Sequence, residues 1–432
     1  MTHGTRRATL LITALLMSNA SVAQERLTLE EAIARGLQQS ARLAELQARE
    51  AAAGAAEQSR GAARLPIVAA LAGYTRTNHV DEFSIVAPGG PPRVIYPDVP
   101  DNLRARIDLQ WPIYTAGRLD ALERAARAER SAAAEDIETA RADLRLEVTR
   151  AFWALVTARE SEQVLDRSVK NLDVHLGDLR ARLDQGLIPP NDVLTAEAQR
   201  SRRQGLLIEA SNTRAIAAAD LRRLIGGTGT VVPVEPAGSG RVSADASGRV
   251  RPERRALDQR LEAARERERA VQAQSKPQIS LGAGYDYARP NPRIFPRAER
   301  WDDSWDISVN ASWTLWDGGR RAAERAEAAA LARATEARMT DFDRSAAFEV
   351  EARRLDLDSA RALIAAADAG IRAAEEARRV VDERYRAGVV TSTEVLDAEL
   401  ALLQAQLDRT RAVAAARLAE ARLTRAWGSP TP

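Results

Sequence analysis

The segment WTLWDGGR, residues 313 to 320, joins two very different parts of the sequence. Before it, polar and apolar residues alternate, and after it comes a long run rich in Ala, Arg and Glu. Alternation with a period of two is typical of a β-strand, whereas an Ala-rich run without proline favours a helix. The two glycines permit a turn of the backbone between them. We therefore predict that a strand passes directly into a long helix at this point.

The same pattern occurs a second time. WPIYTAGR, residues 111 to 118, repeats the tryptophan, the aromatic residue, the glycine and the arginine 202 residues earlier. At this offset Gly186 aligns with Gly388 and Glu197 with Glu399, and upstream an offset of 211 aligns Pro66 with Pro277. A tandem duplication accounts for these matches.

The duplication predicts the organisation of the whole chain. We expect a signal peptide at 1–23, a first repeat at 24–226, a linker at mid-height at 227–250, a second repeat at 251–428 and a tail at 429–432. In the first repeat a helix precedes barrel strands at 66–77 and 103–116, a long helix at 118–185 and a return helix at 190–225. In the second repeat a helix precedes strands at 277–288 and 304–316, a long helix at 319–387 and a return helix at 392–427.

The first residues have the composition of a secretory signal. Arg6 and Arg7 precede an apolar run, and Ser21-Val22-Ala23 suits cleavage before Gln24. The chain has 63 basic and 61 acidic residues, and the predicted leader contains two arginines and no acid, so the mature chain is formally neutral. This balance argues against a nucleic-acid partner. Because the sequence has no cysteine, we expect no disulfide, no thiol nucleophile and no lipid anchor on an N-terminal Cys.

The strands carry most of the information about the membrane. Every odd position from Trp305 to Leu315 is apolar, and the even positions between them are polar. Strands of about 10 residues with one apolar face and aromatic ends fit the lipid-facing wall of a β-barrel, although a soluble sandwich is the alternative. Four strands are too few, since about eight are needed to close a barrel, so several chains would have to build it. The predicted aromatic girdle consists of Tyr74, Trp111, Tyr114, Tyr285, Trp305, Trp313 and Trp316.

Long coiled-coil helices are predicted from the spacing of proline and leucine. No proline occurs between Ile113 and Ile188, which permits a helix of roughly 65 residues, or about 100 Å. Steps of four and three residues alternate, as in a coiled coil, along Leu165, Val169, Leu172, Leu176, Leu179 and Leu183. The return helices are about half as long, and we expect the helices that precede the strands to stack end to end with them.

The sequence resembles the TolC family of outer-membrane factors, also called outer membrane efflux proteins. The resemblance rests on the opening LTLEEAI at 27–33, the duplicated strand-to-helix signature, and the tip motifs GLIPPNDVLTAE and YRAGVVTSTEVLDAE. It implies a mainly α protein with a membrane β-barrel: a trimer with a 12-stranded barrel, four strands per chain, continuous with a long α-helical coiled-coil barrel. It also implies an outer-membrane location extending into the periplasm, a periplasmic adaptor (membrane fusion) protein, and an inner-membrane pump of the RND, ABC or MFS type. The implied function is a passive exit duct for efflux or type I secretion.

The resemblance also assigns roles to residues at the helix tips. It places a pore constriction, favouring cations and acting as a gate, at Asp192, Glu394 and Asp397. The alternative for Glu394 is a capping box with Thr391, in which both groups only stabilise the start of the helix. The adaptor-facing tip loops would contain Gly186, Leu187, Gly388 and Val389, and the alternative for these glycines is plain helix termination.

Chemistry other than transport finds little support in the sequence. Outside the leader the histidines are His79, in a predicted loop, and His175, which we interpret as a solvated residue of the first long helix. They cannot form a His-rich metal site or a Cys/His nucleophile. We therefore expect no enzymatic activity, no metal and no cofactor. The competing function is a periplasmic coiled-coil protein, structural or adaptor-like, whose strands form a soluble domain.

Overall fold

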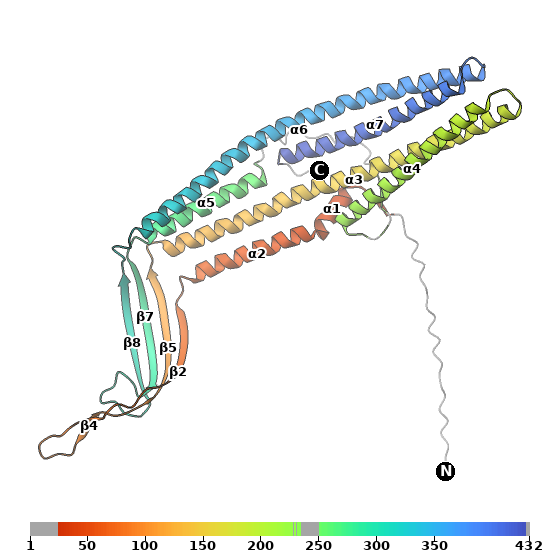
Figure 1. Ribbon diagram of the computed structural model, residues 1–432. Helices are drawn as coiled ribbons and strands as arrows, with labels where there is room; N and C mark the ends of the chain where they lie inside the picture. The colour runs from red at the N-terminus through yellow and green to blue at the C-terminus, as the bar shows by residue number, and fades with distance from the viewer. Residues whose placement is uncertain (1–24, 228, 230, 235–249, 429–432) are drawn as a thin grey trace, which may run out of the picture.

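The computed structural model describes residues 25–227, 229, 231–234 and 250–428. The predicted signal peptide and tail lie outside these residues, as does most of the predicted linker. Figure 1 shows a long set of parallel helices with a curved β-sheet at one end. Within the described ranges, no helix combines the length and the apolar character needed to cross a membrane.

The sheet contains two strands from each repeat. Its antiparallel order is β2 (Ile67–Arg76), β5 (Asp101–Tyr114), β7 (Gln278–Arg289) and β8 (Asp302–Ser312). The repeats meet where β5 pairs with β7, which leaves β2 and β8 at the two edges. Strand β8 ends at Ser312, before the predicted end at 316, so Trp313 and Trp316 follow the strand.

Strand register gives the sheet one apolar and one polar face. Trp111 pairs with Leu281, and Leu281 pairs with Val309. On the other face, polar residues of β5 and β8 pair with the same residues of β7, one from each side. Strand β2 departs from this pattern, because Ile67 and Leu71 are also apolar and pair with residues of the polar face of β5. This explains why its alternation is weak in the sequence.

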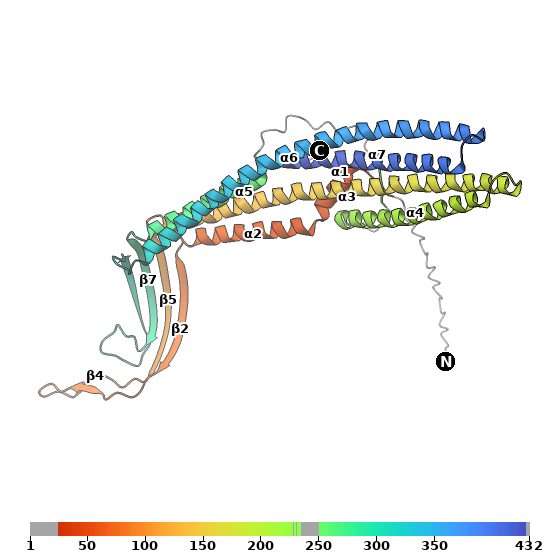
Figure 2. The same cartoon turned by 45° about the horizontal axis from the view of Figure 1, so that its top comes forward.

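The helices extend from the sheet in two hairpins. Helices α3 (Arg118–Asp184) and α6 (Arg320–Arg386) each contain 67 residues and follow β5 and β8. Helices α4 (Pro190–Ile225) and α7 (Ser392–Ala426) return beside them. Helices α1 (Leu29–Gln39), α2 (Ala41–Ala62) and α5 (Pro252–Ala273) precede the strands. Figure 2 shows α2 in line with α4, and α5 in line with α7, so each pair spans the length of one long helix.

The predicted coiled-coil positions of α3 are buried. Leu165, Val169, Leu172, Leu176 and Leu179 are at most 5% exposed, and Leu183 packs against the same cluster. Burying these side chains holds α3 against the return helix and the second hairpin, because tertiary packing rather than helix propensity stabilises so long a helix.

Two short sheets were not predicted from the sequence. Strand β1 (Glu25–Leu27) pairs in parallel with β6 (Val231–Pro233), and their Leu27 and Val231 join the core at mid-height with Phe152 of α3. A hairpin of β3 (Phe83–Ile85) and β4 (Arg93–Tyr96) extends from the far end of the main sheet. Strands of three or four residues leave too little periodicity in a sequence to be recognised.

Candidate functional site

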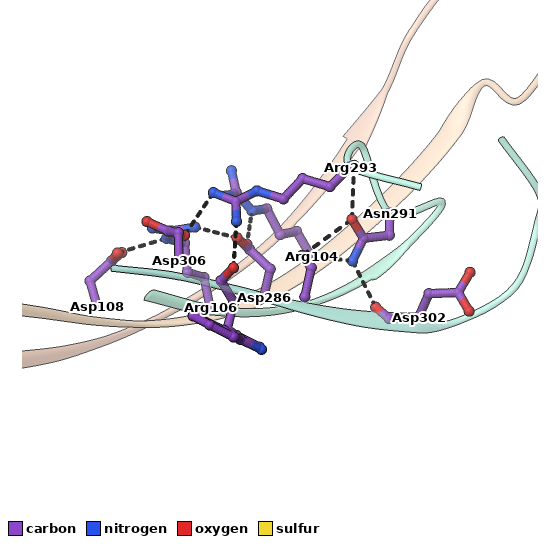
Figure 3. Close-up of polar contacts among 10 residues, drawn as sticks. Arg104, Arg106, Asp108, Asp286, Asn291, Arg293, Asp302 and Asp306 are labelled. Atoms are coloured by element: carbon purple, nitrogen blue, oxygen red, sulfur yellow. Dashed lines mark hydrogen bonds and ion pairs between the residues drawn. The ribbon is translucent and has the colours of Figure 1, made fainter. Parts of the chain in front are cut away.

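Charged side chains cover the half of the polar sheet face that lies farther from the helices. Figure 3 shows Arg104 and Arg106 of β5 converging on Asp286 of β7. Asp286 is 1% exposed and accepts from Arg104 Nε at 2.5 Å and from Arg106. Arg106 Nε also donates to Asp108 Oδ1 at 2.6 Å. Because each buried charge has an opposite partner, the cost of removing it from water is offset.

The connection between β7 and β8 folds onto this network. Asn291 Nδ2 donates to Ser304 Oγ and to the Asp302 carbonyl, both at 3.0 Å. Arg293 donates to Asp306 Oδ1 at 2.8 Å and to the Trp305 carbonyl at 2.7 Å. The loop is therefore tied to the polar face, which is suited to contact with water rather than lipid.

Five of the seven predicted girdle residues lie on the apolar face of the sheet, and Trp313 and Trp316 follow β8. All are 42% to 85% exposed. Tyr74, Tyr285 and Trp305 lie toward the end of the sheet that is far from the helices. The other four lie near the helices: Trp111, Tyr114, Trp313 and Trp316. Their role at a lipid interface stays a prediction.

Equivalent tryptophans make equivalent bonds in the two repeats. Trp111 Nε1 donates to the Arg64 carbonyl and Trp313 Nε1 to the Ser275 carbonyl, each at 3.0 Å. These bonds hold each indole against the end of the preceding helix, where the sheet begins. Sequence reasoning missed a further aromatic pair near the far end, Tyr287 and Trp301, whose rings stack with centroids 4.9 Å apart.

Both helix tips end in the same hydrogen-bonded turn. Gly186 and Gly388 each have φ of +73°, a left-handed conformation that favours glycine. Gly388 N–H donates to the Tyr385 carbonyl at 3.0 Å and Val389 N–H to the Arg384 carbonyl at 2.9 Å, and Gly186 and Leu187 make the matching pair of bonds. This is a Schellman motif. Leu187 and Val389 project as exposed apolar side chains, 67% and 64% accessible.

The three predicted constriction residues lie near the tips but do not bond to one another. Asp192 is in the first turn of α4 and half-buried, whereas Glu394 and Asp397 are exposed near the start of α7. Glu394 Oε1 accepts from Thr391 N–H at 3.3 Å, so it does form the helix-capping contact that was the alternative. Asp397 makes no side-chain hydrogen bond or ion pair with any other residue that the structure describes.

The prediction that His175 is solvated was wrong. His175 is 9% exposed, and its Nε2 lies 3.1 Å from Ser392 Oγ of the second hairpin. It follows Leu172 by three residues and precedes Leu179 by four, so the helical period itself could have placed it on the buried face. Among residues 25–227, 229, 231–234 and 250–428, no group of three or more His, Asp or Glu side chains is placed to hold a metal ion.

A second buried contact joins the two hairpins nearby. Arg203 of α4 is 2% exposed and donates to Glu399 Oε2 of α7 at 3.1 Å and to Ser168 Oγ at 3.0 Å. This pair could not be predicted from the sequence, because its members are far apart in the chain and belong to different repeats.

A sheet with one apolar and one polar face, continued by helices of 67 residues, fits the class of outer-membrane channel proteins. Residues 32–227 and 249–429 match the profile of the outer membrane efflux protein family, and the chain belongs to this family. It is therefore an outer-membrane channel that extends into the periplasm and serves as an exit duct for efflux. The predicted mainly α fold, with tandem repeats, a β-barrel part and a helical-barrel part, is confirmed.

Solved structures share this fold at low sequence identity. VceC from Vibrio cholerae is 21% identical, with a TM-score of 0.79 over 93% of this chain and 96% of that chain. The CmeC outer membrane channel of Campylobacter jejuni is 16% identical, with a TM-score of 0.78 over 93% and 85%. The open state of the MtrE channel of Neisseria gonorrhoeae is 19% identical, with a TM-score of 0.74 over 93% and 89%. Among curated protein sequences, no match was found.

Proposed function

We propose that three copies of this chain close into a 12-stranded barrel and a continuous helical tunnel, which together form the passive duct. The observation that carries the proposal is the open sheet: β2 and β8 have no partner strand on their outer sides in the described part of the chain. An open edge exposes unpaired backbone groups, which cannot remain unpaired in lipid. Pairing β8 of each copy with β2 of the next removes every edge, and the apolar face then meets lipid with its aromatic girdle.

The surface of α6 supports the same assembly. Among the described residues of α6, only Ala332, Leu357 and Ala360 are buried. Large apolar side chains stand exposed along it, including Phe348 at 75% and Leu355 at 61%. A neighbouring copy packed along α6 would cover this apolar surface, which a single soluble chain would rarely leave exposed.

Assembly partners are proposed at the far end of the helices. We assign the tips, with Gly186, Leu187, Gly388 and Val389, to contact with a periplasmic adaptor protein, because two exposed apolar side chains stand on hydrogen-bonded turns there. The adaptor would connect the duct to an inner-membrane pump of the RND, ABC or MFS type, in a tripartite efflux or type I secretion system. The duct itself would conduct without catalysing a reaction.

The acidic tip residues are proposed to narrow the pore and to favour cations. Asp397 gives this proposal its strongest support. Its carboxylate is exposed, and within the described chain it makes no hydrogen bond or ion pair that would give it a structural role. Three copies would bring three Asp397 carboxylates, with Glu394 and Asp192 nearby, into one ring. Glu394 would serve both as a cap and as part of the ring.

Single-channel recording in a planar lipid bilayer tests this arrangement. Asp397→Asn removes the charge at nearly constant volume, and we expect weaker cation selectivity, measured as the reversal potential in a salt gradient, with altered conductance. Glu394→Gln is the matched comparison, because it removes a charge but keeps an oxygen that can cap the helix. The double variant Asp397→Asn/Glu394→Gln removes both charges. If it kept both the conductance and the cation selectivity of the unchanged protein, Asp397 and Glu394 would not line the constriction.

A further inference from the structure

A basic cavity lies where the sheet joins the helices. Its volume is about 800 Å³, and its walls come from the first turns of α3 and α6, the end of α5 and the segment that follows β8. Five basic side chains and one acidic side chain line it: Arg124, Arg269, Lys276, Arg321, Arg325 and Asp317. The cavity is therefore strongly biased toward anions.

Ion pairs beneath the cavity neutralise only part of this charge. Glu266 is 1% exposed, forms an ion pair with Arg124 at 2.9 Å and accepts a hydrogen bond from Arg269, which fixes both guanidinium groups at the wall. Asp317 pairs with Arg321 at 2.6 Å. Two further cations, Lys276 and Arg325, form no hydrogen bond or ion pair through their side chains with any residue in the described ranges.

The first repeat has no such excess at the equivalent place. There Arg64 pairs with Asp120 at 2.8 Å and with Glu123 at 2.5 Å. At the offset of 202, Ala322 stands in place of Asp120 and Arg325 in place of Glu123. A junction of strand and helix can thus be built with balanced charge, so the unpaired cations of the second repeat need another explanation.

The cavity also has an apolar rim. Trp313 and Leu315 line it and are 60% and 75% exposed. Trp313 continues the odd-numbered, apolar series of β8 and lies at the helix end of the sheet. Trp at such a level is typical of the boundary between lipid tails and headgroups. An occupant should therefore have an anionic head and an apolar tail.

We propose that this cavity binds the phosphate headgroup of an anionic phospholipid from the periplasmic leaflet of the outer membrane. Lys276 and Arg325 supply the unpaired charge, Arg124 and Arg269 donate hydrogen bonds from fixed positions, and the acyl chains lie along Trp313 and Leu315. The inference rests on the proposed orientation of the apolar sheet face toward lipid. One headgroup per chain would fix the depth of the duct in the membrane.

Native mass spectrometry of the delipidated, detergent-solubilised full chain tests the proposal. The probes are phosphatidylglycerol and phosphatidylcholine with identical acyl chains. We expect one phosphatidylglycerol per chain, bound more tightly than phosphatidylcholine. Removing both free cations in Lys276→Gln/Arg325→Gln should weaken phosphatidylglycerol binding by tenfold or more, since each basic residue near anionic lipid contributes on the order of a fivefold change in affinity.

Two further variants make the result specific. Ala322→Asp/Arg325→Glu recreates the acidic side chains of the first repeat and should abolish the preference for phosphatidylglycerol. Arg361→Gln/Arg372→Gln removes two exposed cations of α6 far from the sheet and should change nothing. Equal binding of the two lipids, or an equal loss in the Arg361/Arg372 variant, would overturn the proposal.

Free inorganic phosphate carries the same anionic group as the lipid headgroup and is the alternative occupant of the cavity. If inorganic phosphate at millimolar concentration displaced phosphatidylglycerol from the unchanged protein, the site would serve a soluble anion and the lipid assignment would be wrong. The same spectra report the number of chains per complex. Failure of trimer assembly is thereby recorded separately from loss of the lipid.

Discussion

At the residue scale, His175 joins the two helical hairpins through a contact that depends on its charge. Its imidazole is buried against Ser392 at the start of α7, and its ring centroid lies 5.6 Å from that of Tyr385 on α6. Burial lowers the pKa of His175 below its ordinary value of 6.5. The charges facing it partly oppose this shift, because Glu399, Asp178 and Asp382 raise the pKa while Arg182 lowers it. Relative to the unfolded chain, the folded protein therefore favours the neutral form of His175.

Because the pKa of His175 is lowered on folding, the stability of the contact between the hairpins depends on pH. The unfolded chain binds a proton more readily than the folded chain, so the contribution of His175 to stability is full above about pH 6.5 and is lost as the pH falls toward the folded pKa. We expect the thermal midpoint of His175→Gln, in detergent, to fall less between about pH 7.5 and about pH 5 than that of the unchanged protein. Val174→Gln, at the neighbouring position of α3, which is 69% exposed, is the control and should keep the full decline because it removes no titratable group. Identical declines in all three proteins would contradict this account.

At the element scale, the tip turns depend on a backbone conformation rather than on packing. A side chain added at Gly388 would meet no atom within 4 Å, so its cost would arise from the left-handed φ of +73°. Gly388→Ala should therefore destabilise the end of α6 by about 1–2 kcal/mol. Hydrogen exchange of the segment around Val389 measures the local opening, and it should be faster in the variant. Gly388→Asn should be milder, because Asn tolerates this conformation. Equal protection in Gly388→Ala would show that the turn can form without glycine.

The elements could be predicted wherever one residue period dominates. Strand β8 was visible because polar and apolar residues alternate between Trp305 and Val309, and α3 because leucines recur at coiled-coil spacing. Strand β2 was weak because Leu71 occupies the polar face at an edge of the sheet. The polar network around Asp286 was not predicted, because its arginines lie in the other repeat. Contacts between repeats depend on how distant segments pack, and the residue period of a single helix or strand contains no information about this packing.

At the scale of the whole molecule, one chain does not form a closed barrel by itself. In the part of the chain that the structure describes, the sheet has two open edges and helix α6 an exposed apolar surface. The proposed lateral addition of identical copies would cover both. In a closed ring each copy uses one edge to the left and one to the right, which is a heterologous interface. The twelve strands of the proposed trimer would exceed the minimum for a closed barrel and would leave an interior wide enough for a channel. The charged network on the polar face would then line that interior.

Cysteine cross-linking can test this closure, because the chain has no cysteine of its own. Ala69 of β2 lies on the polar face, as do Ser304, Ser308 and Ser312 of β8. We expect that Ala69→Cys, combined in turn with Cys at each of these three positions, will give oxidised species of two and three chains for at least one pair, seen on a denaturing gel.

A bond within one chain cannot produce this result. Strands β5 and β7 separate the two edges by about 14 Å at 4.8 Å per strand, whereas a disulfide requires Cα atoms within about 7 Å. Each single-cysteine variant is the control and should give no ladder. Absence of cross-linking at all three positions, or a ladder that continues beyond three chains, would contradict a closed trimer. A ladder that stops at three would place β8 of each copy beside β2 of the next, which is the contact that turns an open sheet into a pore.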